Sequence, residues 1–187
     1  MKLTDCHNFQ DFRKLAERKL PSPIFNYIDG AAEDETTYIR NTQSFERCDL
    51  VPNILRGVAD IDTSVKVMGQ NLDIPIYCSP TALQRLFHHE GENAVAAAAD
   101  KNGTLFGVSS LGTVSLQEIR KQYHGPQCYQ FYFHKDRGLN KAMLENAKEV
   151  GVEIMMLTVD TIREVTGSVI CAPVSRFHSN SVSKACT

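Results

Sequence analysis

Residues 128–159 read CYQFYFHKDRGLNKAMLENAKEVGVEIMMLTV, and this stretch decides the fold class. It begins and ends with apolar runs of strand length, residues 128–133 and 154–159. Between them, apolar residues recur at offsets of three and four and predict an amphipathic helix that Gly151 ends: Leu139, Ala142, Met143, Ala147 and Val150. A strand, a helix and a second strand in this order predict a parallel βαβ unit.

The same alternation extends upstream. Residues 74–80 and 104–108 predict strands, and the alanine-rich residues 90–101 predict a helix that Asn102 and Gly103 end. Ser115 and Glu118 form a capping box at the start of the next helix. The repeat of roughly 25 residues gives about four βα units, half of a TIM (β/α)₈ barrel, which typically takes about 250 residues. A flavodoxin-like sheet has the same periodicity, so both α/β folds stay open on pattern alone.

Helical spacing at Phe9, Phe12, Leu15 and Ala16, followed by Pro21 and Pro23, predicts helices ahead of the sheet. The 187 residues carry a formal charge of −2, which argues against nucleic acid as the main partner. The polar N-terminus is unlike a signal peptide, and no apolar run reaches membrane-spanning length. The six cysteines include no CxxC pair. We therefore expect a cytoplasmic, reduced protein.

Small polar residues gather where the predicted strands end. The four strand ends hold residues 79–82, 109–110, 130–132 and 158–160. Functional groups of parallel α/β folds collect at these ends. Hydroxyls, amides and backbone N–H groups suit a flat ligand that is rich in nitrogen and oxygen. Structural roles remain open for single residues: Tyr132 as a core aromatic, and Asp160 as a helix N-cap.

Other sites have weaker support. His88, His89 and Glu90 suggest a metal site, but adjacent histidines in a loop seldom converge on one ion, so we expect no metal. The sequence has no GxGxxG or GxxxxGK[ST] phosphate loop. Ser109 and Ser110 lack a GxSxG elbow, which argues against a hydrolase.

Six strings in order resemble the FMN-dependent 2-hydroxy-acid dehydrogenase family, across roughly residues 8–162. They are PIFNYIDGAAEDE (23–35), NTQSF (41–45), PIYCSPTALQ (75–84), HEGE (89–92), QFYFHKDR (130–137) and LTVDT (157–161). Within the family, the chain looks most like bacterial L-lactate dehydrogenases of the cytochrome- or quinone-linked type. Tyr132 and the first string argue against another FMN barrel enzyme, such as an isomerase.

The resemblance implies a TIM barrel with FMN at the top of its strands and oxidation of an L-2-hydroxy acid, such as L-lactate to pyruvate. Pro80, Thr81 and Ala82 would lie against the flavin. The isoalloxazine edge would be bound by Ser109, Gln130 and Thr158. Tyr132 would face the substrate and Asp160 would support the site. Phe25 stands where the family often has a tyrosine that binds the substrate carboxylate, a difference that some lactate-type members share.

The family's flavin-side lysine, histidine base, substrate arginine and phosphate loop belong to the second half of its barrel. None of the six histidines matches the base motif: His7, His88, His89, His124, His134 and His178. We therefore expect residues 1–162 to form the N-terminal part of the FMN domain, inactive as this chain. An alternative from another class is a non-catalytic half-barrel that dimerises or binds a partner.

Residues 163–187 have no amphipathic period, and we expect an aberrant, disordered tail. With suitable codons, residues 163–176 read one base back give TGGNRERDLRTGFT, which resembles the family's continuation after LTVDT. A single-base deletion near the Ile162 codon is the hypothesis. The resemblance further implies a quinone or cytochrome as electron acceptor, a possible homo-oligomer, and peripheral attachment to the inner membrane.

Overall fold

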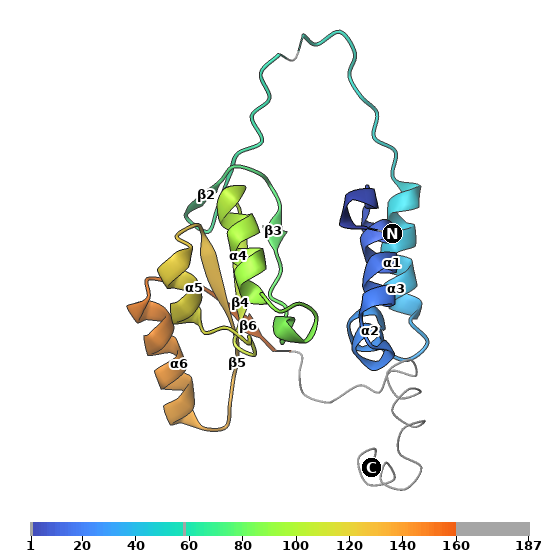
Figure 1. The fold of residues 1–187 in the computed structure, drawn as a ribbon. Coiled ribbons are helices and arrows are strands. Elements are labelled where there is room, and N and C mark those ends of the chain that lie inside the picture. Colours follow the sequence, from blue (N-terminus) through green and yellow to red (C-terminus); the bar gives the residue numbers. More distant parts are fainter. Residues whose placement is uncertain (1, 58, 160–187) are drawn as a thin grey trace, which may run out of the picture. The chain divides into compact units, whose positions relative to one another are not determined.

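The computed structural model describes residues 2–57 and 59–159. The described chain forms two compact units, which divide between Arg56 and Gly57 (Figure 1). Within the described residues, no helix has the length and apolar character needed to cross a lipid bilayer.

The first unit is helical, as predicted. It contains the 3₁₀ turns η1 (Leu3–Asp5) and η2 (Ser44–Arg47) and the helices α1 (Phe9–Lys19), α2 (Ser22–Asp29) and α3 (Thr36–Gln43). The Asn8 side chain caps α1 by accepting a 3.0 Å hydrogen bond from the N–H of Asp11. Leu15 of α1 and Phe25 of α2 are the buried apolar residues here. Arg13 and Asp29 join the two helices by a bidentate ion pair of 2.5 and 2.7 Å.

The second unit begins with a hairpin that the sequence analysis did not predict. Strands β1 (Val65–Val67) and β2 (Gln70–Leu72) pair antiparallel. Met68 and Gly69 form the two-residue turn and both have positive φ, of 49° and 83°. Positive φ at both turn residues matches the twist of hairpin strands, although methionine is an unusual residue there.

Four parallel strands follow in chain order: β3 (Tyr77–Cys78), β4 (Leu105–Ser109), β5 (Gln127–Tyr132) and β6 (Ile154–Thr158). The turn η3 (Gln84–Leu86) and the helices α4 (Glu92–Lys101), α5 (Leu116–Gln122) and α6 (Arg137–Glu149) lie between them in sequence. Strand β3 is shorter than the predicted 74–80. Pro75 lacks an N–H for the ladder, so regular pairing begins only at Tyr77.

The predicted N-cap at Ser115 and the predicted helix stops at Gly103 and Gly151 are confirmed, whereas helix α4 begins at Glu92, two residues after the predicted start. Ser115 caps α5 by accepting a 3.2 Å hydrogen bond from the N–H of Glu118. Asn102 is the C-cap residue of α4 and is followed by Gly103 at φ +58°. Gly151 follows α6 at φ +76°. The left-handed backbone at both glycines ends the helices without steric cost.

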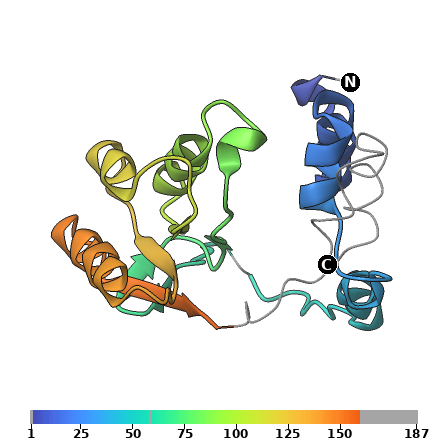
Figure 2. The ribbon, with the colours of Figure 1, turned by 90° about the horizontal axis from the view of Figure 1, so that it is seen from below.

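Two apolar layers cover opposite faces of the sheet. Helices α4, α5 and α6 cover one face of the sheet (Figure 2). Their residues Ala96, Ile119 and Ala147 pack with Phe106, Val108 and Phe131 of the strands. On the other face, Leu72 of the hairpin packs with Leu105 and Cys128. Sequential strand order with helices on one face is the arrangement of a (β/α)₈ barrel, whereas a flavodoxin-like sheet reverses its order and carries helices on both faces. The fold is therefore the first half of a TIM barrel, preceded by helices.

Candidate flavin site

Four of the predicted site residues share one face of the sheet. Side chains alternate along a strand, so Ser109 lies on the face of Leu105, and Gln130 and Tyr132 lie on the face of Cys128. Thr158 follows Ile154 and Met156 in the same way. This is the face opposite the helices, which is the interior of a barrel, and all four residues lie at the C-terminal ends of their strands.

Three of these residues form a hydrogen-bonded row across β4, β5 and β6. The Ser109 hydroxyl donates to Gln130 Oε1 at 3.1 Å, and Gln130 Nε2 donates to Thr158 Oγ1 at 2.6 Å. The N–H of Leu111 donates to Ser109 Oγ at 3.2 Å and so orients that hydroxyl. One N–H of the Gln130 amide and the hydroxyl hydrogen of Thr158 have no acceptor among the described residues. Both groups therefore keep the capacity for one further hydrogen bond.

Pro80, Thr81 and Ala82 form the loop after β3. Gly107 allows this loop to approach β4 closely, because a Cβ at Gly107 would lie 2.8 Å from Pro80 Cδ and 2.9 Å from Pro80 N. The N–H of Leu83 donates to the carbonyl of Leu111 at 3.1 Å, which joins the loops after β3 and β4. The loop is thus held beside the strand that carries Ser109.

An open cavity of about 650 Å³ lies at the ends of β5 and β6. It is lined by Leu111, Tyr132, Phe133, His134, Leu157, Thr158 and Val159. The structure brings the predicted residues Tyr132 and Thr158 together in this cavity. Ser109 and Gln130 are buried, and Pro80, Thr81 and Ala82 do not line it. Leu111 and His134 were not expected from the sequence, because their loops reach the cavity only through the fold.

The loop after β5 is fixed by Asn140, another residue the sequence analysis did not single out. The side chain of Asn140 is buried in α6. Its Oδ1 accepts from the N–H of His134 at 2.9 Å, and its Nδ2 donates to the His134 carbonyl at 2.8 Å. Both hydrogen-bonding groups of the amide therefore hold the backbone of a cavity-lining residue.

Two predicted site residues fall elsewhere. Phe25 belongs to the first unit, where it is 9% exposed and borders a cavity of about 260 Å³ with Arg13 and Asp29. Its role in substrate binding stays a prediction. Asp160 lies outside the described residues, and so do His178 and the tail 163–187.

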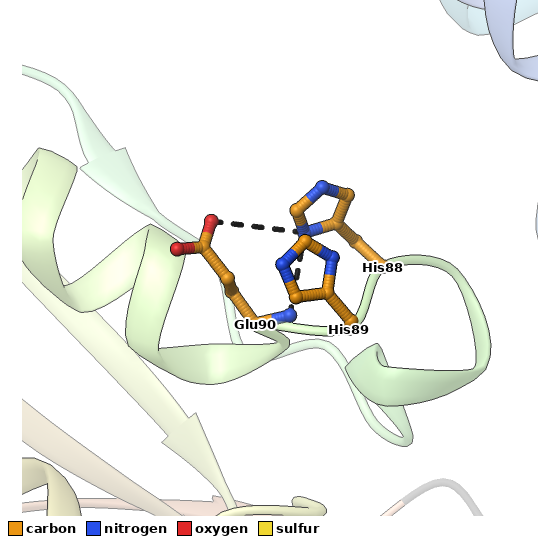
Figure 3. Close-up of side chains that lie close together, drawn as sticks. All are labelled: His88, His89 and Glu90. Atoms are coloured by element: carbon orange, nitrogen blue, oxygen red, sulfur yellow. Dashed lines mark hydrogen bonds and ion pairs between the residues drawn. The ribbon is translucent and has the colours of Figure 1, made fainter.

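His88, His89 and Glu90 form an exposed cluster ahead of α4 (Figure 3). Their candidate ligand atoms lie within 4.8 Å of one another. The N–H of Glu90 donates to His88 Nδ1 at 3.4 Å, and this same nitrogen lies 3.9 Å from Glu90 Oε2. A ring nitrogen that accepts a backbone hydrogen bond has its lone pair engaged, which disfavours it as a ligand in this conformation. The absence of a metal stays a prediction.

Comparison with known proteins defines the class. The family model described as FMN-dependent dehydrogenase matches residues 16–167, and the chain belongs to this family. Among curated relatives, Glycolate oxidase 3 of Arabidopsis thaliana is 37% identical over 156 residues, which cover 83% of this chain and 42% of the relative. Glycolate oxidase of Spinacia oleracea is 35% identical over the same length and with the same coverage.

Solved structures show the same relationship. A lactate oxidase described as putative, from Pediococcus acidilactici, superposes with a TM-score of 0.86 at 30% identity, over 91% of this chain and 48% of that protein. The flavin-binding domain of baker's yeast flavocytochrome b2 gives 0.88 at 28% identity, over 96% and 47%. The chain thus spans less than half the length of these relatives. The predicted family, its dependence on FMN and the half-barrel fold are confirmed.

The residues present at the strand ends fit a flavin. The isoalloxazine edge carries alternating donors and acceptors, and the row from Ser109 to Thr158 offers hydroxyls and an amide, which can act as either. The Ser110 hydroxyl at the same strand end is buried and has no hydrogen-bond partner among the described residues. A buried polar group without a partner is costly, so a ligand that satisfied it would stabilise this end of the sheet.

Proposed function

We propose that this chain holds FMN at the C-terminal ends of its strands, as the first half of an enzyme that oxidises an L-2-hydroxy acid. The hydrogen-bonded row of Ser109, Gln130 and Thr158 carries the proposal. Three side chains from three neighbouring strands have been brought to one edge, where they link to one another and retain spare donors. Relatives named as glycolate oxidases and a lactate oxidase support the substrate class.

Each site residue has a defined task in this proposal. Ser109, Gln130 and Thr158 bind the polar edge of the isoalloxazine ring. The loop of Pro80, Thr81 and Ala82 covers the ring from the side of β3, and the Tyr132 hydroxyl faces the substrate. FMN, when bound, supplies the electron-accepting chemistry, while the protein positions substrate and excludes water. Two further residues complete the proposed site. Phe25 is proposed to bind the substrate, and Asp160 is proposed to support the site.

We propose L-lactate, oxidised to pyruvate, as the substrate. Lactate differs from glycolate by one methyl group on the reacting carbon, and the cavity that Tyr132 lines also has the apolar side chain of Leu111 in its wall. Burial of a methyl group stabilises binding by about 0.8 kcal/mol, which sets the scale of the preference. A quinone or cytochrome acceptor, cytoplasmic location and peripheral attachment to the inner membrane remain proposals that rest on the resemblance.

The chain is proposed to lack turnover on its own, because no histidine matches the family's base motif. His134 lines the cavity, and its backbone is held by Asn140. The test is anaerobic addition of L-lactate, glycolate and mandelate to the purified chain after FMN loading. Bound flavin that stays oxidised is the expected result. Bleaching by lactate that the His134→Gln variant abolishes would contradict it and make His134 the base.

The nucleotide sequence provides the companion test. If one base is missing near the Ile162 codon, insertion of that base restores a family-like frame through residues 163–187. In the protein made from the corrected gene, L-lactate should then bleach the bound flavin more readily than glycolate does. A gene in which no single-base insertion near Ile162 restores that frame would exclude the deletion.

A second candidate function is a non-catalytic half-barrel that dimerises. Strand β6 pairs only with β5 within the described residues, and an open strand edge is a template for pairing with another chain. Met155 and Leu157 lie on the face that the helices cover over β5, yet they are 50% and 48% exposed. Sedimentation of the chain with and without FMN separates the two: a folded stoichiometric dimer that binds no flavin would favour this second function.

A further inference from the structure

Glu92 is a buried carboxylate that the proposed function does not use. It is the first residue of α4, its exposed fraction is 0%, and no lysine, arginine or histidine among the described residues forms an ion pair with it. Transfer of an unpaired charge into a protein interior is costly unless hydrogen bonds replace the lost water. A residue kept in this state has partners that compensate the cost.

Those partners come from two different loops. Oε1 accepts from the N–H of Thr113 at 2.8 Å, and Oε2 accepts from the Thr113 hydroxyl at 2.6 Å. Oε1 also accepts a longer bond, of 3.4 Å, from the N–H of Gln84. Gln84 lies in the loop after β3 and Thr113 in the loop after β4, so one side chain in a third element joins both.

Further contacts make this junction compact. The N–H of Arg85 donates to Thr113 Oγ1 at 3.1 Å, so the same hydroxyl connects the loops a second time. Gly91 has no space for a side chain, because a Cβ there would lie 2.7 Å from Arg85 Cγ and 3.3 Å from Thr113 Oγ1. Gln84 also donates from Nε2 to the carbonyl of Thr81 at 3.2 Å, so Gln84 links Glu92 to the loop of Pro80, Thr81 and Ala82.

We propose that Glu92 is a positioning residue for the flavin: it locks the loop that carries Pro80, Thr81 and Ala82 against the loop that follows Ser109. The inference rests on the proposed function, because it gives these two loops their ligand. Glu92 itself touches neither flavin nor substrate. It acts through Gln84 and Thr113, by fixing two walls of the site in the register that the ring requires.

Amide hydrogen exchange on the chain without FMN tests the lock directly. The Glu92→Gln variant keeps the shape of the side chain and removes its charge. Loss of one charged hydrogen bond should speed exchange at the amides of Gln84, Arg85 and Thr113 by about tenfold or more. The amides of Phe106 and Tyr129, in the strands beneath, should keep their wild-type protection. Glu90→Gln is the matched control, because it removes an exposed charge two residues away.

A second pair of variants approaches the junction from the other side. Thr113→Val removes the hydroxyl that contacts both Glu92 and Arg85, and Thr113→Ser restores it. If Glu92→Gln does not fold, the comparison of Thr113→Val with Thr113→Ser decides the question by the same exchange measurement. Flavin affinity, measured by fluorescence titration with FMN, should fall by about tenfold in Glu92→Gln and in Thr113→Val but not in Thr113→Ser.

Each result has one meaning. Faster exchange in both loops together with weaker FMN binding supports the inference. Faster exchange confined to the first turn of α4 makes Glu92 a local helix residue and overturns it, as does unchanged FMN affinity in variants of a chain that binds FMN. If the wild-type chain binds no FMN, the proposed function fails. The exchange measurement still decides whether Glu92 joins the two loops: faster exchange in both loops of the variants means that it does, and faster exchange in one loop alone means that it does not.

Discussion

Gln130 Nε2 donates a 2.6 Å hydrogen bond to Thr158 Oγ1, from the inner face of β5 to that of β6. Ser109 donates to Oε1 at the other end of the same amide, so both ends of the Gln130 side chain are held by hydrogen bonds. The amide thus presents its remaining N–H from a single orientation. A ligand edge at this position meets a donor whose direction is already set, which lowers the entropic cost of binding.

Gln130→Leu should weaken FMN binding. The substitution removes the amide that links three strands and leaves the Thr158 hydroxyl without its donor. A lost buried hydrogen bond of about 1–3 kcal/mol corresponds to a loss of roughly 5- to 150-fold in affinity, measured by flavin fluorescence titration. Gln122→Leu, on the exposed end of α5, is the control and should bind FMN as the wild type does. Equal affinities in the two variants would remove Gln130 from the site.

Gly107→Ala should displace the loop after β3. The new Cβ would meet Pro80 N at 2.9 Å and the Cys78 carbonyl oxygen at 3.2 Å, and these backbone atoms cannot move independently. Overpacking of this kind costs about 1–3 kcal/mol of unfolding free energy, measured by urea denaturation. In Gly138→Ala, by contrast, the nearest atom is the Asp136 carboxylate oxygen at 3.2 Å, and the site lies in helix α6. A loss of stability in Gly138→Ala as large as that in Gly107→Ala would show that the close approach of Pro80 is unimportant.

The stability of the chain should fall in acid through Glu92. Burial raises the pKa of this carboxyl, but hydrogen bonds from Thr113 and from backbone N–H groups outweigh it and leave the pKa below its ordinary value. In the unfolded chain the ordinary pKa is about 4.3. The stabilisation is therefore fully present above about pH 4.3 and is lost as the pH falls through the lowered pKa.

Urea unfolding at a series of pH values checks this sign. The stability difference between wild type and Glu92→Gln should be largest near neutral pH and should shrink below about pH 4.3. Glu149→Gln, at the exposed end of α6, is the control. A difference that stays constant from neutral pH into acid would mean that the Glu92 charge does not stabilise the fold.

Asp29→Asn should loosen the helices of the first unit. Hydrogen bonding to Asp29 raises the pKa of the Arg13 guanidinium. The pair is partly exposed, with 38% and 22% of the side chains accessible, so the expected loss is about 0.5–1 kcal/mol. Thermal unfolding followed by helix circular dichroism measures it. Asp34→Asn, which alters a carboxylate outside helices α1 and α2, should leave the helices unchanged; a larger effect there would contradict the role of the ion pair.

The alternation of strands and helices was predictable because its signals are local. Apolar spacing between Leu139 and Val150, the cap at Ser115 and the stop at Gly151 need only a few neighbouring residues. The β1–β2 hairpin was missed for the opposite reason. Its strands have three residues each, and its turn uses Met68 and Gly69 rather than a common hairpin pair. Leu72 is buried by Leu105 and Cys128, which lie far along the chain.

The candidate site also has features that a local sequence pattern predicts and features that depend on the fold. The shared face of Gln130 and Tyr132 follows from alternation along one strand. The contact between Gln130 and Thr158 needs the register between β5 and β6, which no local pattern contains. Glu92 and Asn140 look like solvent-exposed polar residues of early helical turns. Their burial depends on loops that only the fold brings to them.

The absorbance spectrum of FMN titrated with the purified wild-type chain, and then with Gln130→Leu, tests the central claim most directly. A shifted and structured flavin band is expected with the wild-type chain, at a stoichiometry of one FMN per chain, and a markedly weaker response is expected with the variant. A flavin spectrum that stays that of free FMN in the presence of excess folded wild-type chain would contradict it.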